Sequence, residues 1–182
     1  MRRLVITQNI TVDGRIEMLD DWFDPTRQDE DLLAESRRQD AECDALLLGR
    51  STFEDFRAYW PALTDDPTGI SEYLNGVTKY VVSSTLDEPG WVNSTVLGGD
   101  PISAVRALKS APGRDIVVTG SIGLSHTLIG AALVDEYRLF VHPAVQGRAR
   151  QLFDDGTAQS LRLLGKPRSF AAGIVLLVYC PA

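Results

Sequence analysis

The chain of 182 residues is 44% hydrophobic and 24% charged, proportions typical of a globular protein that folds in water. Its length fits a single domain over residues 1–182 with a substantial hydrophobic core. The net charge is −7, and the segment 13–44 alone holds twelve acidic residues against four arginines. Non-specific nucleic-acid binding needs a basic face, and a membrane span needs about 20 consecutive apolar residues. We therefore expect neither kind of partner.

Two features bear on the compartment. The segment Met1–Thr7 begins with basic residues as an export signal does, but its apolar stretch is short and alternates like a strand, so we expect it to be part of the folded protein. Cys43 and Cys180 allow one disulfide, and two reduced thiols in or near the core is the favoured interpretation. Both features predict a cytoplasmic location.

The first 76 residues show strands and helices in alternation. The sequence predicts, in chain order, a strand over 3–8, an Asp-Gly turn at 13–14, a loop over 17–28, a helix over 30–41 and a buried strand over 45–49. Ser51 and Glu54 have the spacing of a capping box, which predicts that a helix begins there. Residues 61–76 are interpreted as a loop or an irregular helix.

The remaining residues continue the alternation and then change it. The sequence predicts strands over 77–83 and 91–97, a helix that starts at Asp100-Pro101, a strand over 116–119, a helix over 124–133 and a strand over 137–142. A helix between two strands calls for parallel pairing, whereas the last two strands, 160–164 and 174–179, have no helix between them and should pair antiparallel. The predicted fold class is α/β: a mixed, mostly parallel sheet with helices on both faces and an antiparallel C-terminal edge.

A first candidate anion site follows the strand over 45–49. Gly49 ends the strand, and Arg50, Ser51 and Thr52 open a helix whose free N–H groups carry a partial positive charge. Arg50 adds a planar cation suited to phosphate. The alternative is an ordinary turn with a solvated arginine.

A second candidate is the segment Thr119-Gly120-Ser121-Ile122-Gly123, which links a strand to a helix. Its glycines allow a diphosphate to approach the backbone closely, and the helix again offers its N-terminus. The alternative is close packing of helix on strand without a ligand. The spacing is neither a dinucleotide-binding fingerprint of the Rossmann type nor a Walker motif, which would need a lysine.

Hydroxyl side chains gather where the strand over 77–83 ends. Ser83 and Ser84, together with Arg50, would hold the 2′-phosphate that distinguishes NADPH from NADH. The alternative is a simple transition from strand to loop.

In this order and spacing, the motifs resemble the dihydrofolate-reductase-like superfamily, and within it the bacterial branch related to the C-terminal reductase domain of the riboflavin-biosynthesis deaminase/reductase. The resemblance spans nearly the whole chain. The similar segments are 11–15 (TVDGR), 48–54 (LGRSTFE), 59–61 (YWP), 132–139 (ALVDEYRL), 151–156 (QLFDDG) and 173–179 (GIVLLVY). The resemblance implies a three-layer α/β/α fold, NADPH as cofactor and a homodimer.

The resemblance also implies roles for the matched positions. The cofactor contacts would be Val12, Gly14 and Arg15 beside the nicotinamide, Gly49, Arg50, Ser51 and Thr52 at the phosphates, Ser83 and Ser84 at the 2′-phosphate, and Thr119, Gly120, Ser121, Ile122 and Gly123 around the pyrophosphate. Trp22 and Phe23 would lie in a loop over the nicotinamide.

The chain departs from the family's patterns at three places. Gly120 follows Thr119 where dihydrofolate reductases have a Gly-Gly pair. Relatives often have glycines where this chain has Gly147-Arg148-Ala149-Arg150, so the arginines there would alter substrate access or a subunit contact. Folate enzymes bind their pterin through one acidic residue of the first helix. Here Glu30, Asp31 and Glu35 all lie near that place, and the sequence singles out none of them.

The reaction that these features favour is hydride transfer from NADPH to a C=O, C=N or C=C bond of a small heterocyclic substrate. Asp13 is the candidate catalytic group near the nicotinamide, and its alternative is a turn residue that bonds its own backbone. Trp22, Phe23, Tyr59 and Trp60 would form a substrate wall by stacking, and their alternative, favoured most for Trp60, is a small satellite core. No His, Cys or Asp cluster has metal-ligand spacing, so no metal is expected.

Two other functions stay open from the sequence. One is a non-enzymatic NADPH sensor whose substrate pocket is blocked by Arg148 or Arg150. The other is a stand-alone reductase of a ribosylated pyrimidine of the riboflavin type, which would need a second basic site away from Arg50.

Overall fold

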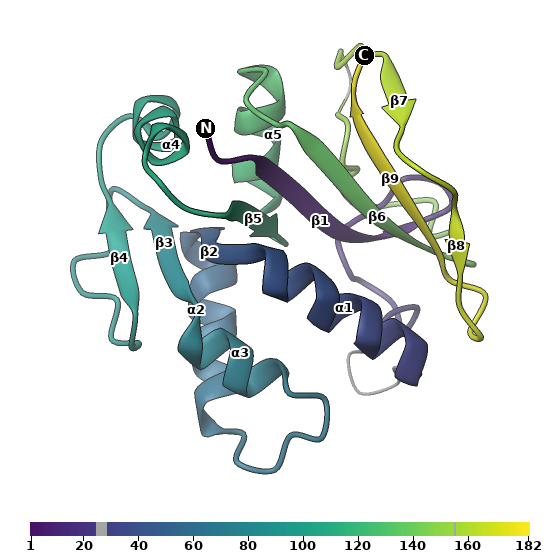
Figure 1. Cartoon of the computed structure of the whole chain (residues 1–182), viewed down its shortest axis with the longest axis horizontal. Helices are drawn as coiled ribbons and strands as arrows, with labels where there is room; N and C mark the ends of the chain where they lie inside the picture. The colour runs from purple at the N-terminus through teal and green to yellow at the C-terminus, as the bar shows by residue number, and fades with distance from the viewer. Residues whose placement is uncertain (25–28, 155) are drawn as a thin grey trace.

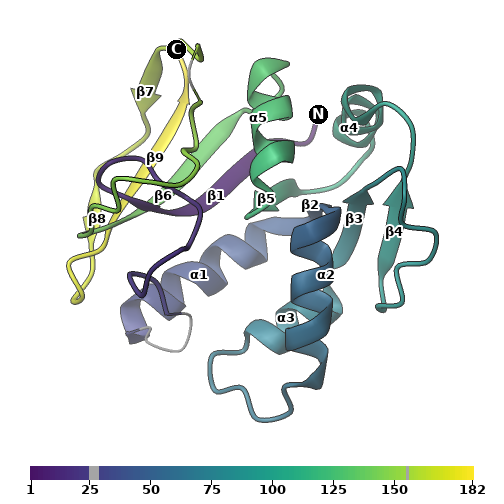
Figure 2. The ribbon, with the colours of Figure 1, turned by 180° about the vertical axis from the view of Figure 1, so that it is seen from behind.

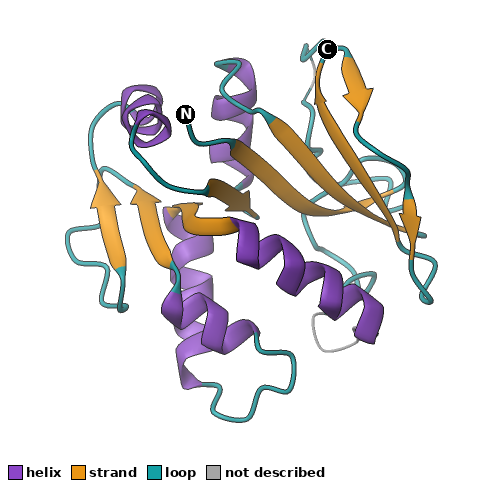
Figure 3. Cartoon of the chain, viewed as in Figure 1, coloured by secondary structure: helices purple, strands orange, loops and turns teal. Residues whose placement is uncertain are grey.

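The computed structural model describes residues 1–24, 29–154 and 156–182, in which helices pack on both faces of one nine-stranded sheet (Figures 1 and 3). The strands are β1 (Leu4–Thr11), β2 (Cys43–Gly49), β3 (Thr78–Val82), β4 (Ser94–Leu97), β5 (Asp115–Thr119), β6 (Glu136–His142), β7 (Leu161–Leu163), β8 (Arg168–Ser169) and β9 (Val175–Pro181). The helices are α1 (Glu30–Glu42), α2 (Arg50–Tyr59), the 3-10 turn η1 (Trp60–Ala62), α3 (Ile70–Gly76), α4 (Pro101–Ser110) and α5 (Ile122–Gly130).

The strand order is β4-β3-β2-β5-β1-β6-β9-β7, with β8 beside β9. The pairs from β4 to β6 are parallel, and β9 runs antiparallel to β6, β7 and β8. The predicted fold class, including the antiparallel C-terminal edge, is confirmed. The two-residue strand β8 had no sequence signal because a segment that short carries no periodicity.

The alternation of β1 divides the core between the two faces of the sheet. Leu4 and Ile6 are fully buried in the cluster that includes Val105 of α4 and Leu128 of α5. Val5, between them, points to the other face. There the cluster takes in side chains of α2 and α3, while α1 packs beside the C-terminal strands. Figure 2 shows the same layers from behind.

The predicted capping box at Ser51 and Glu54 is wrong. Helix α2 begins at Arg50, one residue earlier, and its N-cap is Gly49, which makes no side-chain cap bond. The reason is that β2 runs directly into α2 without a linking residue, which places Ser51 inside the first turn. The N-cap predicted at Asp100 is confirmed, since its carboxylate accepts a hydrogen bond from the Ser103 N–H.

Helix α5 begins at Ile122 and ends at Gly130, so the predicted range 124–133 is shifted. Ala132 adopts a left-handed conformation with φ of 52°, and the N–H groups of Ala132 and Leu133 bond back to the carbonyls of Ile129 and Leu128. This is the Schellman arrangement, which usually carries a glycine at the left-handed position. An alanine there gave the sequence no stop signal.

The other predicted segments agree with the structure within a few residues. The segment 61–76 contains η1 and α3, the loop predicted over 17–28 is confirmed as far as residue 24, and residues 25–28 lie outside the described ranges, as does Asp155 of the family-like segment 151–156. Both cysteines are free thiols. Within the described ranges, every helix is too short or too polar to cross a membrane.

Candidate functional site

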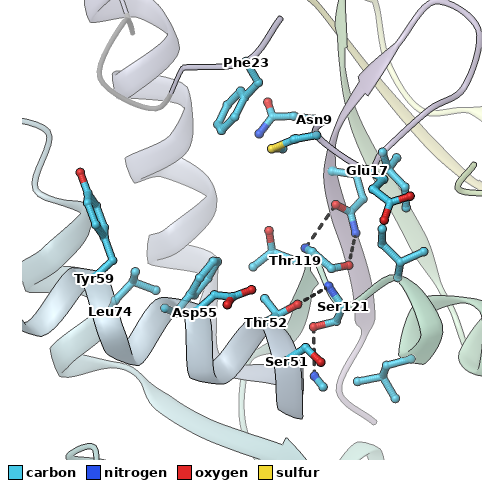
Figure 4. Close-up of a pocket in the computed structure, with 18 of the residues that line it drawn as sticks. Asn9, Glu17, Phe23, Ser51, Thr52, Asp55, Tyr59, Leu74, Thr119 and Ser121 are labelled. Carbon is cyan, nitrogen blue, oxygen red and sulfur yellow. Dashed lines mark hydrogen bonds between the residues drawn. The ribbon is translucent and has the colours of Figure 1, made fainter. Parts of the chain in front are cut away.

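A cavity of about 960 Å³ opens at the carboxyl ends of β1, β2 and β5. This is the edge at which open α/β sheets bind their ligands. Gln8 and Asn9 of β1, Gly49 of β2 and Thr119 of β5 line it. Figure 4 shows Ser51, Thr52 and Ser121 on one side of the cavity, with Tyr59 on another.

Helices α2 and α5 both begin at this cavity. Ser121 stands at the N-cap of α5 but makes no cap bond within its own helix. Its hydroxyl instead accepts a hydrogen bond from the Gly49 N–H at 3.0 Å, and Thr52 Oγ1 accepts one from the Ser121 N–H at 2.9 Å. The first turns of both helices therefore lack a side-chain cap, and their N–H groups and partial positive charges meet at one place, a favourable geometry for an anion.

The segment that joins β5 to α5 approaches α2 too closely for a side chain. Gly120 has φ of +57°, and a Cβ atom on it would lie 2.9 Å from Thr52 Cγ2. Gln8 fixes both peptide groups of Gly120, because its Nε2 donates to the Gly120 carbonyl at 2.6 Å and its Oε1 accepts from the Gly120 N–H at 3.2 Å. The segment is thus preorganised before any ligand binds, and the first turn of α5 that follows it offers N–H groups to a diphosphate.

Arg50 and Ser83 lie at the same sheet edge because Gly49 pairs with Val82. The Arg50 side chain is half exposed, and its Nη1 lies 3.4 Å from Glu54, a weak pairing that leaves it able to turn toward a phosphate. Ser83 Oγ accepts from the N–H groups two and three residues on, at 3.1 and 3.0 Å, and Ser84 is exposed. Ser83 and Ser84 lie beside the cavity, outside its lining.

Of the four predicted substrate-wall residues, Phe23, Tyr59 and Trp60 line the cavity and Trp22 does not. Trp22 Nε1 donates to Gln146 Oε1 at 2.6 Å, and its ring stands edge-on to His142 at 5.2 Å. Burial lowers the pKa of His142, so its ring is neutral at pH 7. Trp22 therefore belongs to the small aromatic cluster that the sequence offered as the alternative.

The predicted nicotinamide border, residues 12–15, forms a turn outside the cavity lining. The Asp13 carboxylate accepts hydrogen bonds from the Thr11 hydroxyl at 2.6 Å and from the N–H groups of Gln146 and Gly147 at 3.1 and 2.8 Å. These bonds hold the pKa of Asp13 well below its usual range. An anion held in this way anchors the loop after β6 and is a poor proton donor.

The comparisons with known proteins agree with this geometry. The family model of the RibD C-terminal domain matches residues 2–176. The chain belongs to the RibD C-terminal domain family. The YyaP protein of Bacillus subtilis (strain 168) is 33% identical over 186 residues, an alignment that covers 98% of this chain and 94% of YyaP.

Solved structures share the fold of this RibD C-terminal domain. A protein assigned to riboflavin biosynthesis in Shewanella sp. PV-4 has a TM-score of 0.74 at 18% identity, covering 99% of each chain. A pyrimidine reductase-like protein of Corynebacterium diphtheriae has a TM-score of 0.68 at 16% identity, covering 100% of this chain and 92% of its own. Dihydrofolate reductase of Enterococcus faecalis, solved in complex with NADP(H) and RAB-propyl, has a TM-score of 0.65 at 16% identity, covering 98% of this chain and 96% of its own. The predicted superfamily is confirmed.

In this RibD C-terminal domain the acidic residue of α1 that faces the cavity is Asp40, which the sequence analysis missed. Glu30 and Asp31 lie in the exposed first turn of α1. Glu35 is buried and pairs with Arg38 and Arg168. The i, i+4 spacing of Ser36 and Asp40, both lining residues, was the available signal, but it could be read only once the inner face of α1 was known.

Asp40 is partly buried and bonded to Tyr73 of α3. Burial raises the pKa of its carboxyl to about 6, against the opposing effects of the Tyr73 bond and of the positive charge of Arg138. Such a carboxyl changes its charge near neutral pH, as groups at functional sites often do. Within the described ranges, no cluster of three or more His, Cys, Asp and Glu side chains has the arrangement of a metal site.

Proposed function

We propose that this RibD C-terminal domain is an NADPH-dependent reductase that transfers a hydride to a C=O, C=N or C=C bond of a small heterocyclic substrate. The observation that carries the proposal is the Ser121 bridge, which joins the starts of α2 and α5 and leaves both uncapped toward the cavity. A dinucleotide carries a pyrophosphate, and two neighbouring helix N-termini form a site that suits this anion.

In this proposal the two segments at the helix starts hold the cofactor. Residues 49–52 and 119–123 would contact its phosphates, and Arg50 with Ser83 and Ser84 would hold the 2′-phosphate. Val12, Gly14 and Arg15 would border the nicotinamide end from the neighbouring turn, which Asp13 stabilises. NADPH supplies the hydride when bound. The protein supplies the near-attack geometry.

The substrate would occupy the part of the cavity away from the helix starts. Phe23 and Tyr59 offer aromatic faces there, and Figure 4 shows both at a distance from Ser51 and Ser121. A flat heterocycle stacks well on such rings and excludes water from the reacting carbon.

The arrangement of the arginines supports an enzyme rather than a blocked sensor. Arg148 pairs with Asp20 and does not line the cavity, and Arg150 is held at the wall by Glu17 at 2.6 Å. Neither arginine fills the space of about 960 Å³. Turnover of a panel of small heterocycles, followed at the NADPH absorbance band, would exclude a pure sensor, and dependence on a substrate phosphate would favour a ribosylated pyrimidine.

A homodimer and a cytoplasmic location complete the proposal. The free thiols of Cys43 and Cys180 suit a reducing compartment. Sedimentation of the purified protein measures the oligomeric state directly.

The deciding experiment is a titration with NADPH and with NADH, followed by tryptophan fluorescence, because Trp60 lines the cavity. The wild type is compared with Arg50→Ala and with Arg106→Ala, an exposed arginine of α4 that serves as the matched control. We expect NADPH to bind at least tenfold more tightly than NADH, and only Arg50→Ala to remove that preference. If neither nucleotide binds the wild type, the proposed reductase function is wrong.

A further inference from the structure

The charges that line the main cavity are separated along its length. At one end, the uncapped starts of α2 and α5 and the Arg50 guanidinium make the wall positive. Farther away, the part of the lining that the structure describes has one more arginine, Arg150, and Glu17 compensates its charge, accepting from its Nη2 at 2.6 Å and from its N–H at 3.1 Å. Asp40 and Asp55 complete the charged lining.

The Asp55 carboxylate differs from the other two acidic groups of the cavity because it has no partner. Glu17 pairs with Arg150, and the Asp40 carboxyl is bonded to Tyr73. Among the described residues, none forms a hydrogen bond or an ion pair with the Asp55 carboxylate. Water solvates this exposed group, so a ligand that displaces the water must bring hydrogen-bond donors in return. A cationic donor gains most, since charge-assisted hydrogen bonds are the stronger ones.

An aromatic ring stands beside this carboxylate. Tyr59 follows Asp55 by one helical turn, so both side chains lie on the face of α2 that lines the cavity (Figure 4). Tyr59 is 48% exposed, and Trp60 packs against it at nearly a right angle, with ring centroids 4.9 Å apart. The face of an aromatic ring attracts cations, and a ring next to a carboxylate is a combination that binds organic cations.

The position of Asp55 in the cavity also selects for charge. Asp55 follows Ser51 by four residues of helix, which places it about 6 Å farther along the axis of α2. It therefore lies between the end proposed for the cofactor phosphates and the aromatic ring of Tyr59. A phosphate or carboxylate of the substrate would be repelled there, whereas an ammonium group would be attracted by Asp55 and by the net charge of −7.

We infer that Asp55 and Tyr59 form a specificity site for a cationic group of the substrate, an alkylammonium attached to its flat ring. The ammonium donates hydrogen bonds to the Asp55 carboxylate and lies against the Tyr59 ring, while the flat ring extends toward Phe23. The inference rests on the proposed reductase function for the role of the ligand as substrate, but the binding of the cation can be tested without turnover.

The test uses three probes that share an indole ring, in calorimetric titrations with and without saturating NADPH. Tryptamine has an alkyl amine that is protonated at pH 7 as lysine is, tryptophol has a neutral hydroxyl in its place, and indole-3-propionate has a carboxylate. We expect the wild type to bind tryptamine about tenfold more tightly than tryptophol, since the ion pair and the cation–π contact each contribute a few-fold. Indole-3-propionate should bind most weakly when NADPH is present.

Variants assign this preference to the site. Asp55→Asn removes the charge and should reduce the preference for tryptamine over tryptophol to about threefold, the part contributed by the Tyr59 ring. Asp65→Asn is the matched control, because Asp65 is an exposed aspartate outside the cavity lining. Asp55→Lys should reverse the selectivity, so that indole-3-propionate binds more tightly than tryptamine.

The outcomes separate the two proposals. Equal affinity of the wild type for tryptamine and tryptophol, absence of any binding of tryptamine, tighter binding of indole-3-propionate with NADPH present, or equal effects of Asp55→Asn and Asp65→Asn would each overturn the cation site. A wild type that prefers tryptamine in the way described but binds no NADPH would overturn the reductase function and leave the cation site standing.

Discussion

The hydroxyl of Ser121, at the N-cap of α5, accepts a hydrogen bond from the Gly49 N–H at the start of α2. A serine at this position ordinarily caps its own helix. Here it ties two helix starts that are 72 residues apart in the chain. The bridge fixes the spacing between two groups of free N–H donors, and this spacing decides whether both can contact one anion.

Removal of the bridge should weaken cofactor binding. In Ser121→Ala the Gly49 N–H loses its acceptor, and one hydrogen bond of about 1 kcal/mol corresponds to roughly fivefold in affinity. We expect the dissociation constant for NADPH to rise by about that factor in a fluorescence titration. Thr127→Ala is the control, because the Thr127 hydroxyl donates to the Gly123 carbonyl of its own helix. Equal affinities for Ser121→Ala and wild type would contradict the role of the bridge.

A side chain at Gly120 should damage the same site through a steric clash. The added Cβ would lie 2.9 Å from Thr52 Cγ2, and φ of +57° costs a non-glycine residue about 1–2 kcal/mol. We expect Gly120→Ala to lower both the melting temperature and the NADPH affinity. The double variant Gly120→Ala with Thr52→Ser removes the clashing methyl and keeps the hydroxyl that binds Ser121, so it should recover part of the loss. No recovery would mean that backbone strain alone causes the effect.

The sequence predicted the fold well because the strands of this chain are short apolar runs bounded by glycines, as at Leu46 to Gly49. It also predicted that residues 49–52 and 119–123 would lie at the cavity, since parallel strands end at one edge. The prediction failed at the N-terminus of α2. Ser51 has the pattern of a cap that Gly49 occupies instead, because β2 runs directly into α2 without a linking residue.

The substrate half of the site was harder to predict for a different reason. The cavity is completed by side chains of α1 and α3 that meet only through the tertiary fold, such as Asp40 and Tyr73. No local pattern signals their proximity. Asp13 drew attention as an acidic residue beside a glycine, but its hydrogen bonds to the loop after β6 could not be read from neighbouring residues.

Asp40 should make stability depend on pH in a direction opposite to most carboxyls. Its pKa is raised from 3.8 to about 6 in the folded chain, so the folded state binds a proton more tightly than the unfolded state. The resulting stabilisation is fully present below about pH 4 and is lost as the pH rises through 6. The groups that face this carboxyl are Tyr73, Cys43 and Arg138.

Urea unfolding of wild type and Asp40→Asn at pH 4.5 and pH 7 measures this effect. We expect the free energy of unfolding of the wild type, relative to the variant, to fall by about 2 kcal/mol between the two pH values. This is less than the full shift gives, because pH 4.5 lies above the ordinary pKa of 3.8. The same comparison with Asp55→Asn controls for the other acidic groups. A constant difference between wild type and Asp40→Asn would show that the Asp40 carboxyl titrates normally.

The end of α5 offers a stabilising substitution. Ala132 is exposed and has φ of 52°, a conformation that costs an alanine about 1–2 kcal/mol and a glycine little. Glycine also gives the unfolded chain more conformational freedom, which offsets part of this stabilisation. We therefore expect Ala132→Gly to raise the free energy of unfolding by a net ~0.5–1 kcal/mol and the melting temperature by about 1–4 °C. Ala131→Gly is the matched control, because Ala131 has φ of −85° and its substitution should lower the melting temperature. If Ala132→Gly destabilised the protein as much as Ala131→Gly, Ala132 would not hold the left-handed conformation that ends α5.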